Sequence, residues 1–395
     1  MEAEWLIPIN DEAMRISFAH DGRVVVSTRG NLSFPSDHVV LSCGNGGTLE
    51  YQHMSGTRGF YSTPYPIKRT ARLISEAAHV GIIGSRLSAI DTVLGLVANG
   101  HSGPITLHSR TGALPSVRGT QGRYAPQFLT LDHVNAHVAR TGAVRLDEFI
   151  GWIFKEMQAA GEDVPATISD LKKMCTQRAP LEYILGEIDA ARAPRLWQAV
   201  LYATNAVIDI VWTAMPEEDK QRFWPYVSWW MCYRVSIPVE NAIKIATLLQ
   251  SGQLQIVPGA LRIDRQPDGQ TIVVVENGET RRYDYDVVIV ATGTPRDVSM
   301  LGNPLVQNML VDRIANGDRF GGIQISPATG ALVDAYGNED ERITVLGELT
   351  SGTFFFTSAL EINARHAANR ADVILQRLAH ANAAAVAWAG ARLQA

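Results

Sequence analysis

The stretch from His79 to Arg110 holds the residues whose types and spacing point most directly to chemistry. It contains a short apolar run, a tight turn, a helical pattern and a second apolar run. Its turn takes the place of the fingerprint G-x-G-x-x-G/A, with which many βαβ units bind a dinucleotide phosphate. The residues at that place are Gly84, Ser85, Arg86, Leu87, Ser88 and Ala89. Glycine permits the sharp turn out of a strand, and the N-terminus of the following helix offers unpaired N–H groups to a phosphate.

Two departures from the fingerprint bear on which nucleotide would bind. Arg86 stands where a second glycine normally lets the pyrophosphate approach the backbone. A long side chain there either blocks the nucleotide or folds aside and pairs with its phosphates. Ser109 and Arg110 stand where an NAD site would carry Asp or Glu, so they favour the 2′-phosphate of NADP(H). The alternative is a βαβ unit that binds nothing.

The elements that must position this turn can be read from the apolar pattern. Val80–Ile83 is a run suited to a strand buried on both faces, and Ile105–His108 is a second one. The residues between them repeat at helical spacing until Asn99 and Gly100, which end the helix. The pattern therefore predicts a strand–turn–helix–strand unit in a parallel sheet.

Two further strands end in glycine, far apart in the chain. A meander of strands over residues 10–44 ends at Gly44 and Asn45, and a near-copy of its last strand runs from Tyr285 to Gly293 after a predicted hairpin. A glycine at such a place lets the backbone pass near a cofactor, although it can also be a simple turn. Two units of this kind predict two nucleotide-binding-type domains, one nested in the other.

Composition limits the classes of protein that remain. The chain has 395 residues, a net charge of −5 and 46% hydrophobic residues, so it can form two domains and shows no nucleic-acid footprint. No apolar run reaches membrane-spanning length. Cysteines are scattered, and no His, Cys, Asp or Glu pattern predicts a metal site. We therefore expect a cytoplasmic protein with no bound metal and no membrane or nucleic-acid partner, whose catalytic residues are unknown.

Residues 145–250 form a predicted helical insertion that is rich in aromatic side chains. Arg234, near its end, could clamp an anionic substrate or a cofactor phosphate through bidentate hydrogen bonds. Trp229 and Trp230, just before it, could line the same pocket. The alternatives are an arginine that pairs with a carboxylate at the edge of the core, and tryptophans that are simply buried.

Several of these motifs together resemble the FAD/NAD(P)-binding flavoproteins with two dinucleotide-binding domains, a group related to flavin monooxygenases and N-hydroxylases. The resemblance rests on residues 81–110, on the strand before Gly44, on residues 286–293, and on the run 343–352 with the helix that follows. It implies an α/β fold: a Rossmann-like, three-layer NAD(P)-binding domain (71–294) nested in a partial FAD-type domain (1–70 and 295–395). Gly347 and Glu348 then lie near the flavin, with Glu348 in place of an Asp that hydrogen-bonds the ribityl chain.

The chain departs from this family at its start, because no glycine fingerprint precedes Gly44. The half-domain that should hold the FAD pyrophosphate is therefore expected to be absent. Three explanations remain open. A companion subunit supplies the missing half and shares the FAD, the chain is a diverged relative that binds only a nicotinamide nucleotide or nothing, or the sequence is truncated. An uncovered sheet edge favours a partner, and hence an oligomer.

The function expected from the residues and the resemblance is a flavin- and NAD(P)H-dependent oxidoreductase, monooxygenase-like, or a subunit of one, acting on a small-molecule substrate. NADP(H) is the nucleotide that the residues favour, and FAD is a shared cofactor. Arg86 and the missing half-domain leave a second interpretation, a redox-inactive scaffold or regulatory subunit. A third is a non-redox enzyme that reuses the cleft beside Arg234.

Overall fold

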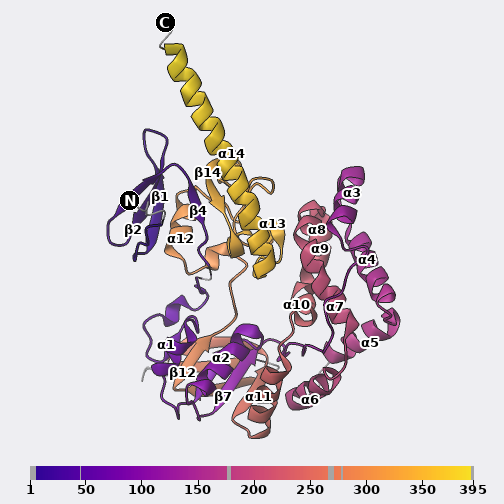
Figure 1. Cartoon of the computed structure of the whole chain (residues 1–395). Coiled ribbons are helices and arrows are strands. Elements are labelled where there is room, and N and C mark those ends of the chain that lie inside the picture. The colour runs from indigo at the N-terminus through magenta and orange to yellow at the C-terminus, as the bar shows by residue number, and fades with distance from the viewer. Residues whose placement is uncertain (1–5, 45, 176–178, 266–270, 277–278, 393–395) are drawn as a thin grey trace. The chain divides into compact units, whose positions relative to one another are not determined.

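The computed structural model describes residues 6–44, 46–175, 179–265, 271–276 and 279–392. The chain divides into two compact units (Figure 1). Unit 1 combines Met1–Gly46 with Pro295–Ala395, and unit 2 is the continuous segment Gly47–Thr294. Unit 2 is therefore inserted into unit 1, and each unit has a sheet of its own.

The centre of unit 2 is a five-stranded parallel sheet in the order β5-β12-β6-β7-β8. All four residues of β6 and all four of β12 are buried, as expected for strands covered on both faces. The bounds of the five strands are β5 Phe60–Tyr61, β6 Val80–Ile83, β7 Ile105–Ser109, β8 Leu254–Pro258 and β12 Val287–Val290.

Different layers cover the two faces of this sheet. Helices pack on one face around Ile82, Leu107 and Ile289, and an antiparallel sheet packs on the other face against Ile83 and Val288. The helices are α1 Ile67–Arg72, α2 Leu87–Ala98 and α11 Val239–Gln250, and the antiparallel strands are β9 Ala260–Arg265, β10 Thr271–Glu276 and β11 Thr280–Tyr285. The predicted three-layer, Rossmann-like α/β fold is confirmed. The predicted turn at Asn277 and Gly278 lies outside the described residues.

The helical part of unit 2 lies between β7 and β8 and begins at Leu131, before the predicted start at residue 145. Its helices are α3 Leu131–Thr141, α4 Leu146–Ala159, α5 Val164–Cys175, α6 Pro180–Ala190, α7 Leu196–Ala203, α8 Ile208–Ala214, α9 Glu217–Phe223 and α10 Val227–Arg234. The apolar pattern from Trp197 to Trp212 is interrupted by a short 3₁₀ turn, η2 Thr204–Ala206. Thr204 explains part of the break, because its hydroxyl donates to the Leu201 carbonyl oxygen at 2.6 Å and competes with the helical pattern.

Unit 1 contains two three-stranded sheets. The first is an antiparallel meander of β1 Ala13–Phe18, β2 Val24–Thr28 and β3 Ser33–Ser36. The second has the order β13-β14-β4, with bounds β4 Val39–Leu41, β13 Ala331–Val333 and β14 Glu339–Val345. The prediction that residues 38–43 end the meander is wrong, because β4 leaves it and pairs in parallel with β14. The last meander strand is β3, which tolerates Pro35 because it lies at a sheet edge.

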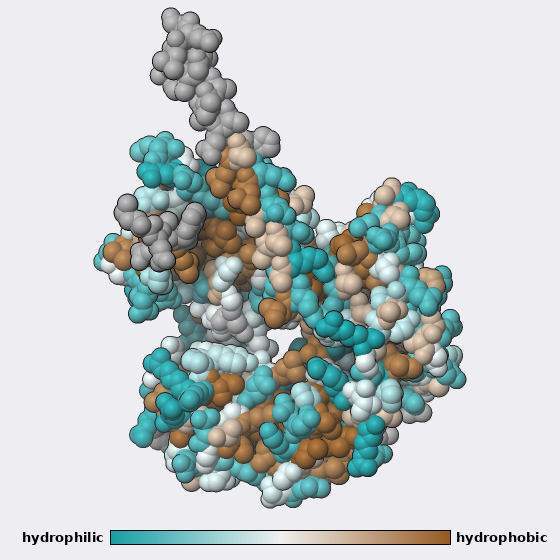
Figure 2. Space-filling model, viewed as in Figure 1, coloured by the Kyte–Doolittle hydropathy of each residue, from teal (hydrophilic) through white to brown (hydrophobic). Residues whose placement is uncertain are grey.

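Helices complete unit 1. They are α12 Pro304–Val311, α13 Ser351–Phe354 and α14 Leu360–Arg392. The core contains Ile16, Leu41, Leu305, Ile343 and Val345, so it joins both sheets to α12. Apolar side chains also reach the surface along α14 (Figure 2), where Leu360, Leu375 and Leu378 are exposed. Among the helices of the described ranges, none has the length and apolar character needed to cross a bilayer.

Candidate functional site

The turn between β6 and α2 in unit 2 has the backbone shape that the fingerprint predicts. Gly84 has φ = +126°, and its N–H donates to the His108 carbonyl oxygen at 2.7 Å. A Cβ added to Gly84 would lie 2.6 Å from the carbonyl oxygen of Ala291, so no other residue fits. Gly84 therefore allows the ends of β6, β7 and β12 to lie close together. Helix α2 begins just after this turn, at Leu87.

The hydroxyl groups of Ser85 and Ser109 tie this turn to the loop after β7. Ser85 Oγ donates to the Ala113 carbonyl oxygen at 2.8 Å and also lies 2.8 Å from Ser109 Oγ. Because its one proton is used for Ala113, the proton between the two hydroxyls belongs to Ser109. Ser109 Oγ in turn accepts from the Gly112 N–H at 2.9 Å. Ser109 therefore supports the loop and has no proton left for a phosphate.

The charged and unpaired donors at this turn come from other residues. Arg110 is exposed at the carboxyl end of β7. The first N–H groups of α2, those of Leu87, Ser88 and Ala89, receive no capping bond from a side chain. Free N–H groups at a helix start and a nearby guanidinium are what an anionic group needs. These donors fit a dinucleotide phosphate.

Arg86, the residue in place of the second glycine, is turned toward the helical part of unit 2. Its Nη2 donates to Ser228 Oγ on α10 at 3.0 Å. Ser228 is 142 positions away in the sequence, and no local pattern marked it as a partner. The partner of Arg86 in the structure is therefore a serine of α10, which neither alternative from the sequence named.

The other predicted glycines also follow parallel strands. Gly293 follows β12 in unit 2, at the sheet edge where Gly84 follows β6, because Val290 is in register with Ile83. In unit 1, Gly44 and Gly347 follow β4 and β14, whose last residues Leu41 and Val345 are paired. No other group lies within 4 Å of where their Cβ atoms would be, so there is open space beside the backbone. Asn45 lies outside the described residues.

Glu348 is half-buried in unit 1, in the short 3₁₀ turn η5 Gly347–Thr350 that follows β14. Burial raises the pKa of its carboxyl group above the usual range, and the charge of Arg296 opposes that rise. Arg296, which sequence reasoning missed, belongs to the same unit and follows the glycine of the second strand motif. The carboxyl group of Glu348, next to Gly347 in the chain, thus interacts electrostatically with the Arg296 guanidinium.

Arg234, Trp229 and Trp230 lie on α10, and the structure gives them different surroundings. Arg234 is buried, with Nε donating to Thr204 Oγ1 at 3.2 Å and Nη2 to Asn205 Oδ1. It therefore ties α10 to η2 through a hydroxyl and an amide oxygen. Trp229 is exposed, whereas the Trp230 Nε1 is buried and has no partner among the described residues.

A buried pair of polar rings lies below the turn and was not predicted. His108 on β7 is fully buried, and its Nε2 lies 2.6 Å from the Tyr285 hydroxyl on β11. Tyr285 fits against β6 because residue 81 is glycine, where a Cβ would lie 2.8 Å from the tyrosine ring. Burial, with a smaller contribution from the charge of His79, lowers the pKa of His108 to about 4.

This pair predicts an acid-dependent loss of stability. Folding lowers the pKa of His108 from its ordinary value of 6.5 to about 4. The free energy of unfolding is therefore highest above pH 6.5 and falls as the pH drops toward 4, because the unfolded chain binds the proton first. The loss is about 3 kcal/mol at most. Urea unfolding of wild type and of His108→Gln, which keeps a hydrogen-bonding side chain without titrating, should give a difference that shrinks over this range. A difference that is constant with pH would contradict the assignment.

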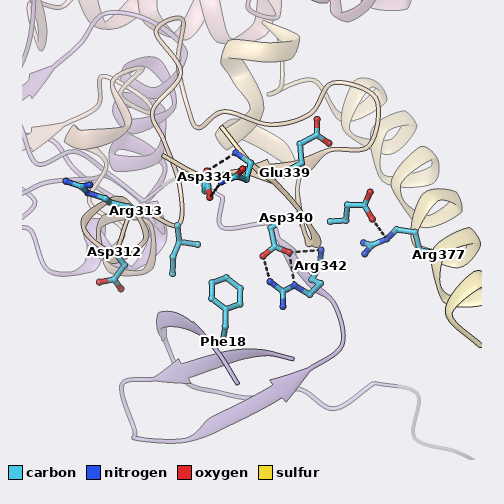
Figure 3. A pocket seen from close by; sticks show the side chains of 11 residues that line it. Phe18, Asp312, Arg313, Asp334, Glu339, Asp340, Arg342 and Arg377 are labelled. Atoms are coloured by element: carbon cyan, nitrogen blue, oxygen red, sulfur yellow. Dashed lines mark hydrogen bonds and ion pairs between the residues drawn. The ribbon is translucent and has the colours of Figure 1, made fainter. Parts of the chain in front are cut away.

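A hollow of about 690 Å³ in unit 1 is lined mainly by charged side chains (Figure 3), and none of the predicted glycines lines it. Four of its eight charged side chains form two ion pairs. Arg342 binds Asp340 through two hydrogen bonds and lies over the Phe18 ring, and Arg377 pairs with Glu341. Among the described residues, no group of three or more metal-ligating side chains occurs. The hollow therefore offers few unpaired groups to a ligand.

The sheet order, the three layers and the glycine turn together define unit 2 as a Rossmann-like α/β unit. No family model and no curated protein matches the sequence. Solved structures of similar arrangement include ornithine hydroxylase from Pseudomonas aeruginosa (13% identity, TM-score 0.47, 93% of this chain and 71% of that one). They also include L-lysine 6-monooxygenase from Pseudomonas syringae (15%, 0.48, 93% and 71%) and bacillithiol disulfide reductase from Bacillus cereus (12%, 0.42, 92% and 70%).

The first two are a hydroxylase and a monooxygenase by name. At such identities, and with TM-scores below 0.5, the likeness assigns neither an activity nor a cofactor to this chain.

Proposed function

We propose that unit 2 binds NADP(H), with the pyrophosphate at the start of α2 and the 2′-phosphate beside Arg110. The observation that carries this proposal is the turn itself. Gly84 holds the one conformation that places the end of β6 against Ala291, and α2 begins there with uncapped N–H groups. Arg110 supplies a positive charge at the end of β7, where a 2′-phosphate would lie and where an NAD site has a carboxylate.

Arg110→Ala tests the choice of nucleotide. The variant should bind NADPH about tenfold or more weakly, because a charge-assisted hydrogen bond to phosphate is lost, and should bind NADH as wild type does. Arg123→Ala is the matched control, since it removes an exposed arginine of the same unit away from β7. Titration calorimetry measures all the affinities. An equal loss for NADPH and NADH, or no binding to wild type, would contradict the proposal.

We propose further that the protein is a flavin-dependent oxidoreductase, or a subunit of one, acting on a small metabolite. Gly44 and Gly347 follow the carboxyl ends of two paired parallel strands in unit 1, and there is open space beside each of them. Ligands of open α/β sheets bind at such edges. A flavin and a nicotinamide nucleotide, when bound, supply hydride transfer. Glu348 and the two glycines would orient the flavin.

We propose more specifically that a companion polypeptide completes the flavin site. β4 is the outer strand of its sheet, no other strand of the described ranges pairs with its free side, and Val40 is 46% exposed. Parallel strands are normally covered, and an open edge is a place where another strand adds. We expect a partner to add a parallel strand along β4 and to complete the flavin site. Leu375 and Leu378 on α14 offer a second apolar surface for assembly.

Co-expression with neighbouring open reading frames tests whether a companion subunit exists. The expected result is a purified complex with the absorbance of bound flavin, which the chain alone lacks. A colourless complex that does not respond to NADPH would support the second candidate function, a redox-inactive scaffold. Arg86 favours that candidate, because it replaces the glycine that lets a pyrophosphate approach the backbone. Arg86→Gly discriminates, since a vestigial site will not bind NADPH in either form.

A further inference from the structure

Helix α10 is fixed at its C-terminal end, and its exposed residue Ser228 contacts the phosphate-binding turn. Its last residues, Cys232 to Arg234, are buried, and the following chain pairs with the segment after β7, where Val117 and Ile237 form a parallel bridge. The Ile237 N–H donates to the Ser116 carbonyl oxygen at 2.9 Å, and the Arg118 N–H donates to the Ile237 carbonyl oxygen at 2.9 Å. The C-terminal end of α10 is thus fixed to the Rossmann-like part of unit 2.

In the N-terminal half of α10, Val227 is buried and Trp230 packs edge-on against Phe223, with ring centroids 6.0 Å apart. Ser228 and Trp229 are exposed, and the contact from Ser228 to the phosphate-binding turn is the single hydrogen bond from Arg86. Among the described residues, no carboxylate pairs with Arg86. Its guanidinium is therefore held by one neutral hydroxyl, in a position where water also competes for it.

A phosphate is a much stronger partner for this guanidinium than a serine hydroxyl. The bond to Ser228 has one charged partner, whereas a phosphate carries the opposite charge and offers the guanidinium two oxygens in a bidentate arrangement. Arg86 is the N-cap residue of α2, so its backbone is next to the N–H groups that would hold a pyrophosphate. One side chain is therefore shared between the nucleotide site and α10.

We propose that Arg86 is a latch: a dinucleotide phosphate at the start of α2 takes Arg86 from Ser228 and so releases the exposed side chains of α10, Ser228 and Trp229, from the turn. The proposal rests on the nucleotide site proposed above and adds its coupling to the helical part of unit 2. The chain carries its own reporters, because Trp229 and Trp230 follow Ser228 directly. Trp229 stacks edge-on against Tyr233 with ring centroids 4.9 Å apart.

The test uses the full chain, NADP⁺ as the probe and tryptophan emission as the readout. Wild type should show an emission change on binding that Trp229→Phe reduces or abolishes. Ser228→Ala, which has no latch to break, should bind NADP⁺ about three- to tenfold more tightly, the range for one exposed hydrogen bond. Its emission without nucleotide should already resemble that of the bound wild type. Ser236→Ala is the matched control, because Ser236 contacts Arg118 near the fixed end of α10 and should leave the affinity unchanged.

The outcomes separate the latch from the nucleotide site. If NADP⁺ binds wild type and Ser228→Ala with equal affinity, or binds without any change in emission, the latch is wrong and the nucleotide site stands. If NADP⁺ and inorganic pyrophosphate bind neither protein, the proposed nucleotide site fails, and the latch fails with it.

Discussion

Replacing Glu156 with alanine should lower the free energy of unfolding by about 4 kcal/mol or more. Glu156 lies on α4 and is fully buried. Its Oε1 accepts the N–H groups of Gln127, Phe128 and Leu129 at 2.8, 2.5 and 2.8 Å, and its Oε2 accepts from the Tyr124 hydroxyl at 2.7 Å. Alanine would remove the acceptor of all four donors, of which the Leu129 N–H belongs to a buried residue. A hydrogen bond to a charged group contributes about 1.5–3 kcal/mol.

Glu156→Gln is the control for this prediction. The amide oxygen can still accept the three backbone N–H groups, and the amide nitrogen can donate to the Tyr124 oxygen, so the loss should be much smaller than for alanine. Guanidinium chloride unfolding, followed through the near-UV signal, gives both values. Equal stability of the alanine variant and wild type would mean that residues 124–129 find other acceptors, and that Glu156 does not hold this loop.

Gly84→Ala should disrupt the phosphate-binding turn and weaken NADPH binding by more than tenfold. Two costs add in this variant. An alanine at φ = +126° is strained by about 1–3 kcal/mol, and its Cβ would lie 2.6 Å from the Ala291 carbonyl oxygen, so β6 and β12 would have to separate. The variant should therefore be both less stable and unable to form the turn at its normal shape.

Gly252→Ala separates the two costs. Gly252 has φ = +76° and lies between α11 and β8, and no other group lies within 4 Å of where its Cβ would be. The control therefore carries the cost of positive φ without the steric overlap, and it should bind NADPH normally. Thermal unfolding and titration calorimetry on both variants provide the comparison. A Gly84→Ala protein with normal affinity would show that the turn is not the nucleotide site.

The fold of unit 2 could be predicted because its signals are local. The buried run at Val80–Ile83, the glycine at position 84 and the helical repeat after it lie within one short stretch, and each indicates the same βαβ unit. The place of β4 could not be predicted in this way. Its apolar run is the same whether it ends a meander or pairs with β14. The partner strand also comes after the whole of unit 2 in the sequence.

In the candidate site, too, local features could be predicted and tertiary contacts could not. The turn residues and Arg110 follow from their positions after strands, whereas the partners of Arg86 and Arg234 depend on tertiary contacts with Ser228 and Thr204. The Ser109 hydroxyl shows a second limit. Its position suited a phosphate, but its only proton is used inside the protein by Ser85, and the sequence contains no sign of that bond.

The insertion of unit 2 into unit 1 has a consequence for synthesis on the ribosome. β4 is made before Gly47–Thr294 and β14 after it, so their parallel pairing must wait until the entire inserted unit has emerged. Domains fold as units during translation, and unit 2 is a continuous segment that can do so first. Until then the nascent chain exposes an unpaired apolar strand. Chaperone binding is therefore expected to concentrate on the early residues of unit 1. A translational pause placed after Thr294 should lengthen the time for which chaperones stay bound.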